Sequence, residues 1–241
     1  MAQHLYPAKE RALAHELVTL TWANPFSPER RKAEFAVLQD KRVWEDAIDV
    51  RAEVMNSLLS QVREFLERCR KKLVAAGSAA GFADDALSHY QTIVFLDAYH
   101  EFASCFDQVI EEAEQRGSCS RRIRFYDQFV DRMQYWFPYG FFGVYRDFEY
   151  KKLFAIFFQV RRAFYHIHYG LIGRSSVARD LRARIWQSVF TRNMDRYQRV
   201  LAGRLGDVIT LITGPSGSGK ELVARGIGLS RFVEFDTNTR L

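Results

Sequence analysis

The sequence predicts a mainly α-helical protein, in which a helical N-terminal bundle is followed by a single strand–loop–helix unit. Apolar side chains recur at helical spacing over most of residues 8–201, which predicts the bundle. Hydrophobic residues make up 48% of the 241 residues, with only 5 Pro and 14 Gly, so the chain can bury a core. The final unit is predicted by a short β-branched apolar run, residues 208–212, that precedes a glycine-rich loop and another helical pattern.

The glycine-rich loop is the main candidate functional site. Residues 214–220 read Gly-Pro-Ser-Gly-Ser-Gly-Lys and fit the phosphate-binding pattern G-x-x-x-x-G-K. The glycines allow a tight turn whose N–H groups point at phosphate oxygens, and the following helix adds its positive N-terminal end. Lys220 supplies a mobile charge for the β- and γ-phosphates. The candidate phosphate-binding residues are Gly214, Pro215, Ser216, Gly217, Ser218, Gly219, Lys220 and Glu221. A glycine- and serine-rich turn that binds nothing is the alternative.

Glu221 narrows the kind of nucleotide-binding protein. It stands where Ser or Thr commonly holds Mg²⁺, which argues against a generic nucleotide kinase or small GTPase. Residues 214–225, Gly-Pro-Ser-Gly-Ser-Gly-Lys-Glu-Leu-Val-Ala-Arg, closely resemble the Walker A segment of sigma-54-interacting transcriptional regulators, the bacterial enhancer-binding branch of the AAA+ ATPases. That family typically reads G-E-S-G-T-G-K-E-L-V-A-R, so the chain differs from it at Pro215 and Ser218.

The resemblance implies ligands, partners and a domain organisation. ATP and Mg²⁺ are the implied ligands, with Glu221 near the Mg²⁺ shell through water. Assembly into a homo-oligomeric ring that remodels RNA polymerase carrying sigma-54 is the implied activity. Residues 1–203 are expected to form a helical regulatory or sensor domain. Residues 204–241 are expected to be the incomplete start of an AAA+ sigma-54 interaction domain, with residues 232–235, Phe-Val-Glu-Phe, opening its second strand.

The chain is expected to be truncated after Walker A. Walker B acids, sensor residues and an arginine finger are not assigned, so no catalytic residue is named and the 241-residue chain is not expected to hydrolyse ATP. DNA binding would need a C-terminal domain that is missing. Two alternatives stay open: another AAA+ or P-loop NTPase with a helical effector domain, and a truncated non-catalytic regulator that acts by protein interaction.

Metal, membrane and nucleic-acid interpretations have weaker support. Three cysteines show no C-x-x-C spacing, and His89, Asp97 and Glu101 match no recognised ligand set, so no metal site is assigned. The longest uncharged aromatic run, residues 133–145, is too short to span a bilayer and no signal peptide is seen, which predicts a cytoplasmic protein without a membrane contact. Residues 151–200 carry 11 basic and 2 acidic side chains; we interpret them as a solvated face of connecting helices, with nucleic-acid binding as the alternative.

Seven helical patterns define the bundle. They cover residues 8–23, 28–39, 44–76, 84–105 with a possible continuation to 116, 147–171, 175–191, and a shorter stretch from Asn193 to about Leu201. Pro28 is expected at the first position of the second helix, after the N-cap Ser27, with Phe35 and Leu38 facing inward. Residues 24–30, Asn-Pro-Phe-Ser-Pro-Glu-Arg, also resemble the N-terminal region of such regulators, although an ordinary helix connection is the favoured interpretation. The third pattern has one apolar stripe, which favours a bundle helix over a dimeric coiled coil, and Gly77 is expected to end it.

Aromatic residues concentrate in one segment. Residues 125–169 contain 18 of the 35 aromatic side chains. A densely packed core is the favoured interpretation of this segment. A ligand pocket is the alternative, and if the helical domain senses a small molecule, this is the predicted place.

Overall fold

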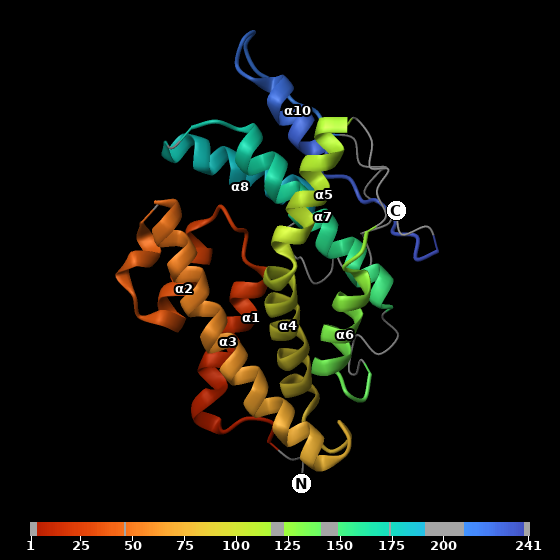
Figure 1. Ribbon diagram of the computed structural model, residues 1–241. Helices are drawn as coiled ribbons and strands as arrows, with labels where there is room; N and C mark the ends of the chain where they lie inside the picture. The colour runs from red at the N-terminus through yellow and green to blue at the C-terminus, as the bar shows by residue number, and fades with distance from the viewer. Residues whose placement is uncertain are drawn as a thin grey trace. The chain divides into compact units, whose positions relative to one another are not determined.

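The computed structural model describes residues 4–45, 47–116, 123–140, 149–173, 175–190 and 210–238 (Figure 1). Within these ranges the chain is mainly helical, as the sequence predicts, and no strand forms. Two short 3-10 turns are η1 (Ala8–Glu10) and η2 (Lys41–Trp44). The α-helices are α1 (Arg11–Trp22), α2 (Pro28–Leu38), α3 (Ile48–Ala76), α4 (Asp84–Glu101), α5 (Ala103–Arg116), α6 (Tyr126–Trp136), α7 (Tyr150–Gly170), α8 (Ser176–Phe190) and α10 (Lys220–Gly228). None of these helices is long and apolar enough to cross a bilayer.

The chain divides into two compact units. Unit 1 comprises Met1–Ala23, Pro28–Glu101 and Asp127–Phe148, and unit 2 comprises Asn24–Ser27, Phe102–Tyr126 and Glu149–Leu241. The helix predicted over residues 84–105, with a possible continuation to 116, forms as two helices: α4 ends at Glu101 in unit 1 and α5 starts at Ala103 in unit 2. The domain boundary expected at residue 203 lies outside the described residues.

Unit 1 is built around α3, and its predicted apolar stripe is confirmed. The stripe residues are at most 1% exposed: Val54, Leu58, Val62, Phe65, Leu66, Cys69 and Leu73. They are covered within the same chain, because α3 packs against α4, α2 and η2, so α3 is a bundle helix. Gly77 ends it in the left-handed conformation, with φ of 68°, which glycine adopts without steric cost.

The inward face of α2 differs from the prediction. Helix α2 begins at Pro28 as expected, but Phe35 and Leu38 are only half-buried. Glu34 is buried instead, because its carboxylate accepts hydrogen bonds from two guanidinium groups. Arg30 Nε donates to Glu34 Oε1 at 3.0 Å, and Arg51 Nη2 donates to Oε2 at 2.8 Å. A buried carboxylate is tolerated when it is paired in this way.

Unit 2 is built around α7, which contacts α5, α8 and α10. Its aromatic side chains pack against one another, as the favoured interpretation of this segment requires: the rings of Phe106 and Phe154 lie 5.1 Å apart, and those of Phe125 and Phe154 lie 5.4 Å apart.

The predicted turn after α6 is present up to Gly140, whose N–H donates to Phe137 O at 2.9 Å, and residues 141–148 lie outside the described residues.

Residues 24–27 belong to unit 2 although they connect two helices of unit 1. Phe26 is buried there and stacks on Phe164 with ring centroids 5.3 Å apart, while Trp186 contacts it edge-on at 6.0 Å. Asn24 Nδ2 donates to Ala183 O at 2.9 Å. This turn is therefore more than the ordinary helix connection that the sequence favours, because it fills part of the core of unit 2.

The expected β–P-loop–α unit is not formed among the described residues. Residues 210–212 form no strand, and Leu211 is 86% exposed; residues 208 and 209 lie outside the described ranges. Residues 232–235 also form no strand, and Phe235 packs instead on Tyr126, with ring centroids 4.8 Å apart. A parallel strand requires hydrogen-bonded neighbours and cover on both faces, and the described part of the chain contains no strand that could pair with it.

Candidate phosphate-binding loop

The glycine-rich loop turns tightly into α10 (Figure 1). Gly217 and Gly219 have φ angles of 74° and 80°, which L-residues with a side chain rarely adopt. Gly214 makes a close approach, because a Cβ there would lie 3.1 Å from Ser218 Oγ. The three glycines predicted for the turn are thus placed where the backbone requires them, and α10 begins at Lys220 directly after Gly219.

Lys220 folds back over the loop. Its Nζ donates to the carbonyl oxygens of Gly214, at 2.8 Å, and of Pro215. Ser218 Oγ also donates to Pro215 O at 2.8 Å. The Ser218 hydroxyl and the Lys220 ammonium group thus both bind carbonyl oxygens of the loop. Since these carbonyls are exposed, a bound phosphate can compete for the ammonium group, whose charge-assisted bond to an anion is stronger than its bonds to neutral carbonyls.

The first turn of α10 offers the amide groups of Lys220 and Glu221 to an anion, whereas Leu222 N–H donates to Gly219 O at 3.0 Å. An α-helix leaves its first N–H groups without partners inside the helix, and no side chain caps α10 at Gly219. Residues 214–218 are exposed, so a ligand can reach the loop. Together with Lys220, these N–H groups form a set of donors that fits a phosphate group.

The same residues do not by themselves form a magnesium site. Glu221 is exposed in the first turn of α10, where its negative charge suits the helix dipole. Within the described ranges, no three His, Cys, Asp or Glu side chains are placed to hold a metal ion. A metal ion at this loop would therefore need further ligands.

Helix α10 is anchored to α7 by buried polar contacts. Gln159 Nε2 donates to Ser230 O at 3.1 Å, and Ser230 Oγ donates to Gly226 O. Gly226 also brings the backbone of α10 close to Ile167, because a Cβ there would lie 4.0 Å from that side chain. The C-terminal end of the helix that follows the glycine-rich loop is therefore attached to the central helix of unit 2. Sequence reasoning missed this connection, since Gln159 and Ser230 are 71 residues apart and belong to no motif.

The polar groups that could suggest a metal have protein partners in unit 1. His89 Nδ1 lies 2.8 Å from the Tyr6 hydroxyl, and Asp97 Oδ1 accepts from Arg63 Nε at 2.7 Å. Burial lowers the pKa of His89 and raises the pKa of Tyr6 to about 12. Both shifts favour a neutral imidazole that accepts a hydrogen bond from the tyrosine hydroxyl. These groups therefore form hydrogen bonds within unit 1.

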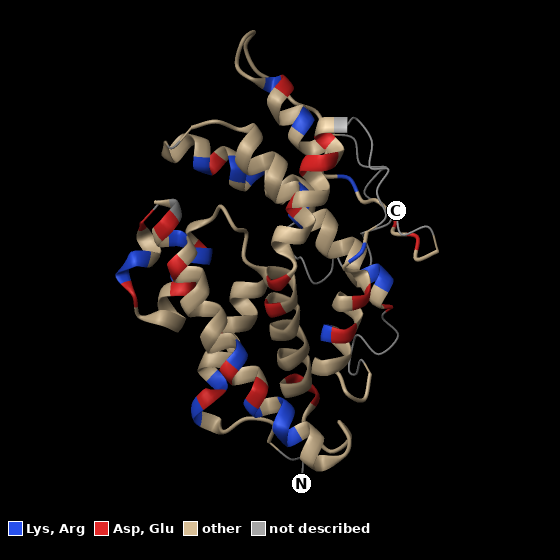
Figure 2. Cartoon of the chain, viewed as in Figure 1, with Lys and Arg blue, Asp and Glu red and all other residues tan. Residues whose placement is uncertain are grey.

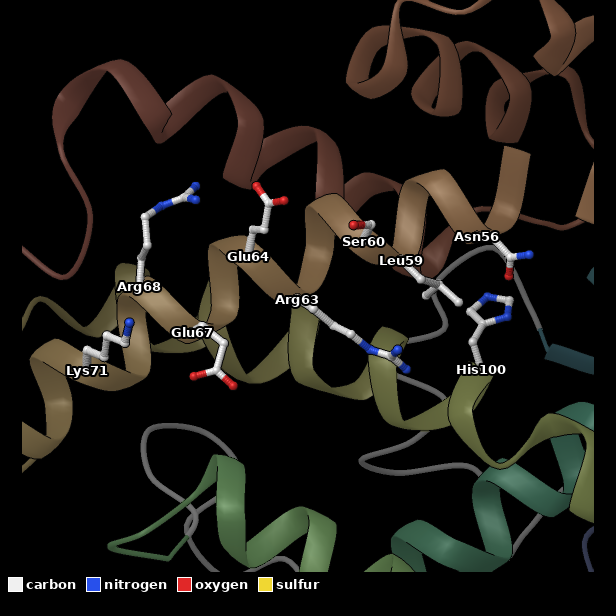
Figure 3. A pocket seen from close by; sticks show the side chains of 9 residues that line it. All are labelled: Asn56, Leu59, Ser60, Arg63, Glu64, Glu67, Arg68, Lys71 and His100. Carbon is white, nitrogen blue, oxygen red and sulfur yellow. The ribbon is translucent and has the colours of Figure 1, made fainter. Parts of the chain in front are cut away.

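A groove of about 790 Å³ runs along α3 in unit 1 (Figure 3). Its lining side chains project from successive turns of α3, and His100 of α4 lies at one end. The charges in the groove already have partners: Glu67 accepts a hydrogen bond from Tyr135 at 2.6 Å, and Arg68 lies 3.3 Å from Glu10. We assign this groove no ligand.

Three described basic side chains of segment 151–200 make contacts within unit 2, and Figure 2 shows several of its basic positions on α8. Arg161 forms a bidentate pair with Asp107, and Arg182 donates to the carbonyls of Leu171 and Gly173. Lys151 lies 3.2 Å from Glu149. These contacts support the interpretation of a helical surface over a nucleic-acid interface. Residues 191–200 of this segment lie outside the described residues.

Comparisons of the chain with protein-family models, with curated proteins and with solved structures find no match. The resemblance to sigma-54-interacting regulators rests on the sequence of residues 214–225. The functional argument below therefore depends on that segment and on the geometry of its loop.

Proposed function

We propose that the protein is a nucleotide-binding regulator of sigma-54-dependent transcription, in which residues 214–221 bind the phosphates of ATP. One observation carries this proposal: Lys220 lies over an exposed loop whose glycines take left-handed angles, at the uncapped start of α10. When bound, ATP would supply a triphosphate to these donors. The chain's own residues would bind and orient it, with Lys220 exchanging two carbonyl oxygens for phosphate oxygens.

The wider role rests on the resemblance of residues 214–225. In this proposal the protein is cytoplasmic and assembles with further copies of itself. Its helical N-terminal region controls an AAA+ module that acts on RNA polymerase carrying sigma-54. The attachment of α10 to α7 supports such control, because a change in the packing of α7 would shift α10, the helix that follows the phosphate loop.

Nucleotide binding by the 241-residue protein tests the proposal. Isothermal titration with ATP, ADP and adenosine should give saturable binding for the two phosphorylated ligands and none for adenosine. Lys220→Ala should weaken ATP binding by about tenfold or more, as expected for the loss of a charge-assisted hydrogen bond. Lys151→Ala is the matched control, because it removes an exposed lysine of unit 2 that lies outside the loop.

The outcomes separate the proposal from its alternatives. Equal ATP affinities of the Lys220→Ala and Lys151→Ala proteins would show that the loop is a turn without a ligand. Binding of ATP without association with sigma-54 polymerase would favour another P-loop protein with a helical effector region.

A further inference from the structure

Unit 2 encloses a cavity of about 450 Å³ between α5, α7, α10 and residues 233–235. Its walls are mainly apolar and include Ile110, Phe154, Phe158, Leu229 and Phe235. The rings of Phe154 and Phe235 lie 4.7 Å apart and form one end of it. The volume is within the range typical of small-molecule sites, about 300–1,000 Å³. The aromatic segment therefore contains a pocket as well as a packed core.

Arg162 is the charged side chain that distinguishes this pocket. Its Nη2 donates to Arg231 O at 2.6 Å, while its Nε is buried without a hydrogen-bond partner. Within the described part of the chain no carboxylate forms an ion pair with it. Arg162 is half-buried, and this burial lowers the pKa of its guanidinium group. A cation placed in this way is stabilised by an anionic partner.

The acidic groups around the pocket do not supply that partner. Glu114 is shared between two other basic groups: it lies 3.5 Å from His166 and 3.8 Å from Arg225. Glu234 is exposed to solvent. The guanidinium group of Arg162 also lies 5.8 Å from the ring of Phe158, so it adjoins an aromatic wall.

We propose that this cavity binds a small amphipathic carboxylate, with an aromatic or aliphatic body against the apolar walls and its carboxylate on Arg162. The planar guanidinium group of Arg162, which lines the cavity, can match a carboxylate through paired hydrogen bonds. The bound acid would act as an effector, because Arg225 and Leu229 of the α10 region line the cavity and α10 begins at the phosphate loop. This regulatory role rests on the proposed nucleotide binding, whereas binding of the acid does not.

The test uses 1-naphthoate as the probe and 1-naphthamide as its neutral analogue, titrated calorimetrically into the full chain. Naphthoate should bind saturably at one site, and the amide should bind at least about tenfold more weakly. Arg162→Gln should weaken naphthoate binding by a similar factor. Arg231→Gln is the matched control, because it removes the same charge from an exposed side chain that does not line the cavity.

A second variant keeps the proposal testable if Arg162→Gln does not fold. Ala113→Phe fills the cavity from α5 and should abolish naphthoate binding while circular dichroism shows unchanged helicity. The proposal is overturned if naphthoate does not bind, if the amide binds equally well, or if Ala113→Phe binds naphthoate like the unsubstituted protein.

The two proposals fail separately. Loss of ATP binding in Lys220→Ala with intact naphthoate binding is expected if both sites exist. If the protein binds naphthoate but does not bind ATP, the proposed function and its regulation are overturned. The proposal that the cavity binds a carboxylate then still stands. If both ligands bind and saturating naphthoate leaves the ATP affinity unchanged, the effector role is refuted.

Discussion

Replacing Glu34 by Gln tests the buried ion cluster of unit 1. The Glu34 side chain is 1% exposed and accepts hydrogen bonds from Arg30 Nε and from Arg51 Nη2 at 2.8–3.0 Å. Glutamine preserves the shape and one acceptor oxygen, but it removes the charge. Two guanidinium groups then remain in the interior without a counter-ion, which is the costly half of breaking a buried pair.

The expected loss follows from that geometry. Removing one partner of a buried ion pair costs about 3–5 kcal/mol, and the retained acceptor of Gln places Glu34→Gln near 3 kcal/mol. In a protein of this size that loss lowers the melting temperature by about 6–12 °C. The exposed pair between Arg42 and Glu53, with side chains 47% and 65% exposed, provides the control: Glu53→Gln should change stability little.

Urea unfolding followed by far-ultraviolet circular dichroism measures both variants against the unsubstituted protein. A midpoint for Glu34→Gln that coincides with that of Glu53→Gln would refute the reasoning, because it would mean that the cluster contributes nothing beyond its packing. A change in the slope of the transition would instead indicate an altered unfolded state.

Two further predictions concern the core of unit 2 and the buried histidines. Phe26→Ala should destabilise the protein by about 3 kcal/mol, because it leaves a cavity between aromatic rings; Phe35→Ala, at a half-buried site, should cost less in the same urea titration. Burial lowers the pKa of His89, His166 and His168 below 6.5. The unfolded chain therefore binds more protons in the window between the lowered values and 6.5, so stability should rise with pH through that window and be complete above it. Melting temperatures from about pH 5 to about pH 8 check this, and His89→Gln should reduce the dependence.

Either prediction can fail plainly. Equal losses for Phe26→Ala and Phe35→Ala would mean that the turn before α2 does not contribute to the core of unit 2. A melting temperature that rises as the pH falls below 6.5 would contradict the direction of the histidine shifts.

The proposed pocket and the proposed phosphate loop lie in the same compact unit, unit 2. Helix α7 contributes Phe154 and Arg162 to the cavity and Gln159 to the anchoring of α10. One helix thus lines the proposed pocket and contacts the end of the helix that follows the proposed phosphate site. The two sites would be coupled if binding of the acid changed how α7 and α10 pack against each other.

The sequence by itself determined the helices and the loop, because these depend on local spacing. The stripe on α3, the stop at Gly77, the start of α2 at Pro28 and the glycines of the phosphate loop all follow from 3.6-residue periodicity and from the conformations that Gly and Pro permit. Even the resemblance of residues 214–225 is a property of one short segment.

Only the tertiary structure decided the features that join distant residues. Glu34 is buried because Arg51 reaches it from α3, and Phe26 lies in a core made by Phe164 and Trp186. The strand expected before the loop failed for the same reason, because a strand exists only through its neighbours, whereas a helix closes its own hydrogen bonds. The position of the Arg162 guanidinium and the cavity beside it likewise come from packing, which no local pattern encodes.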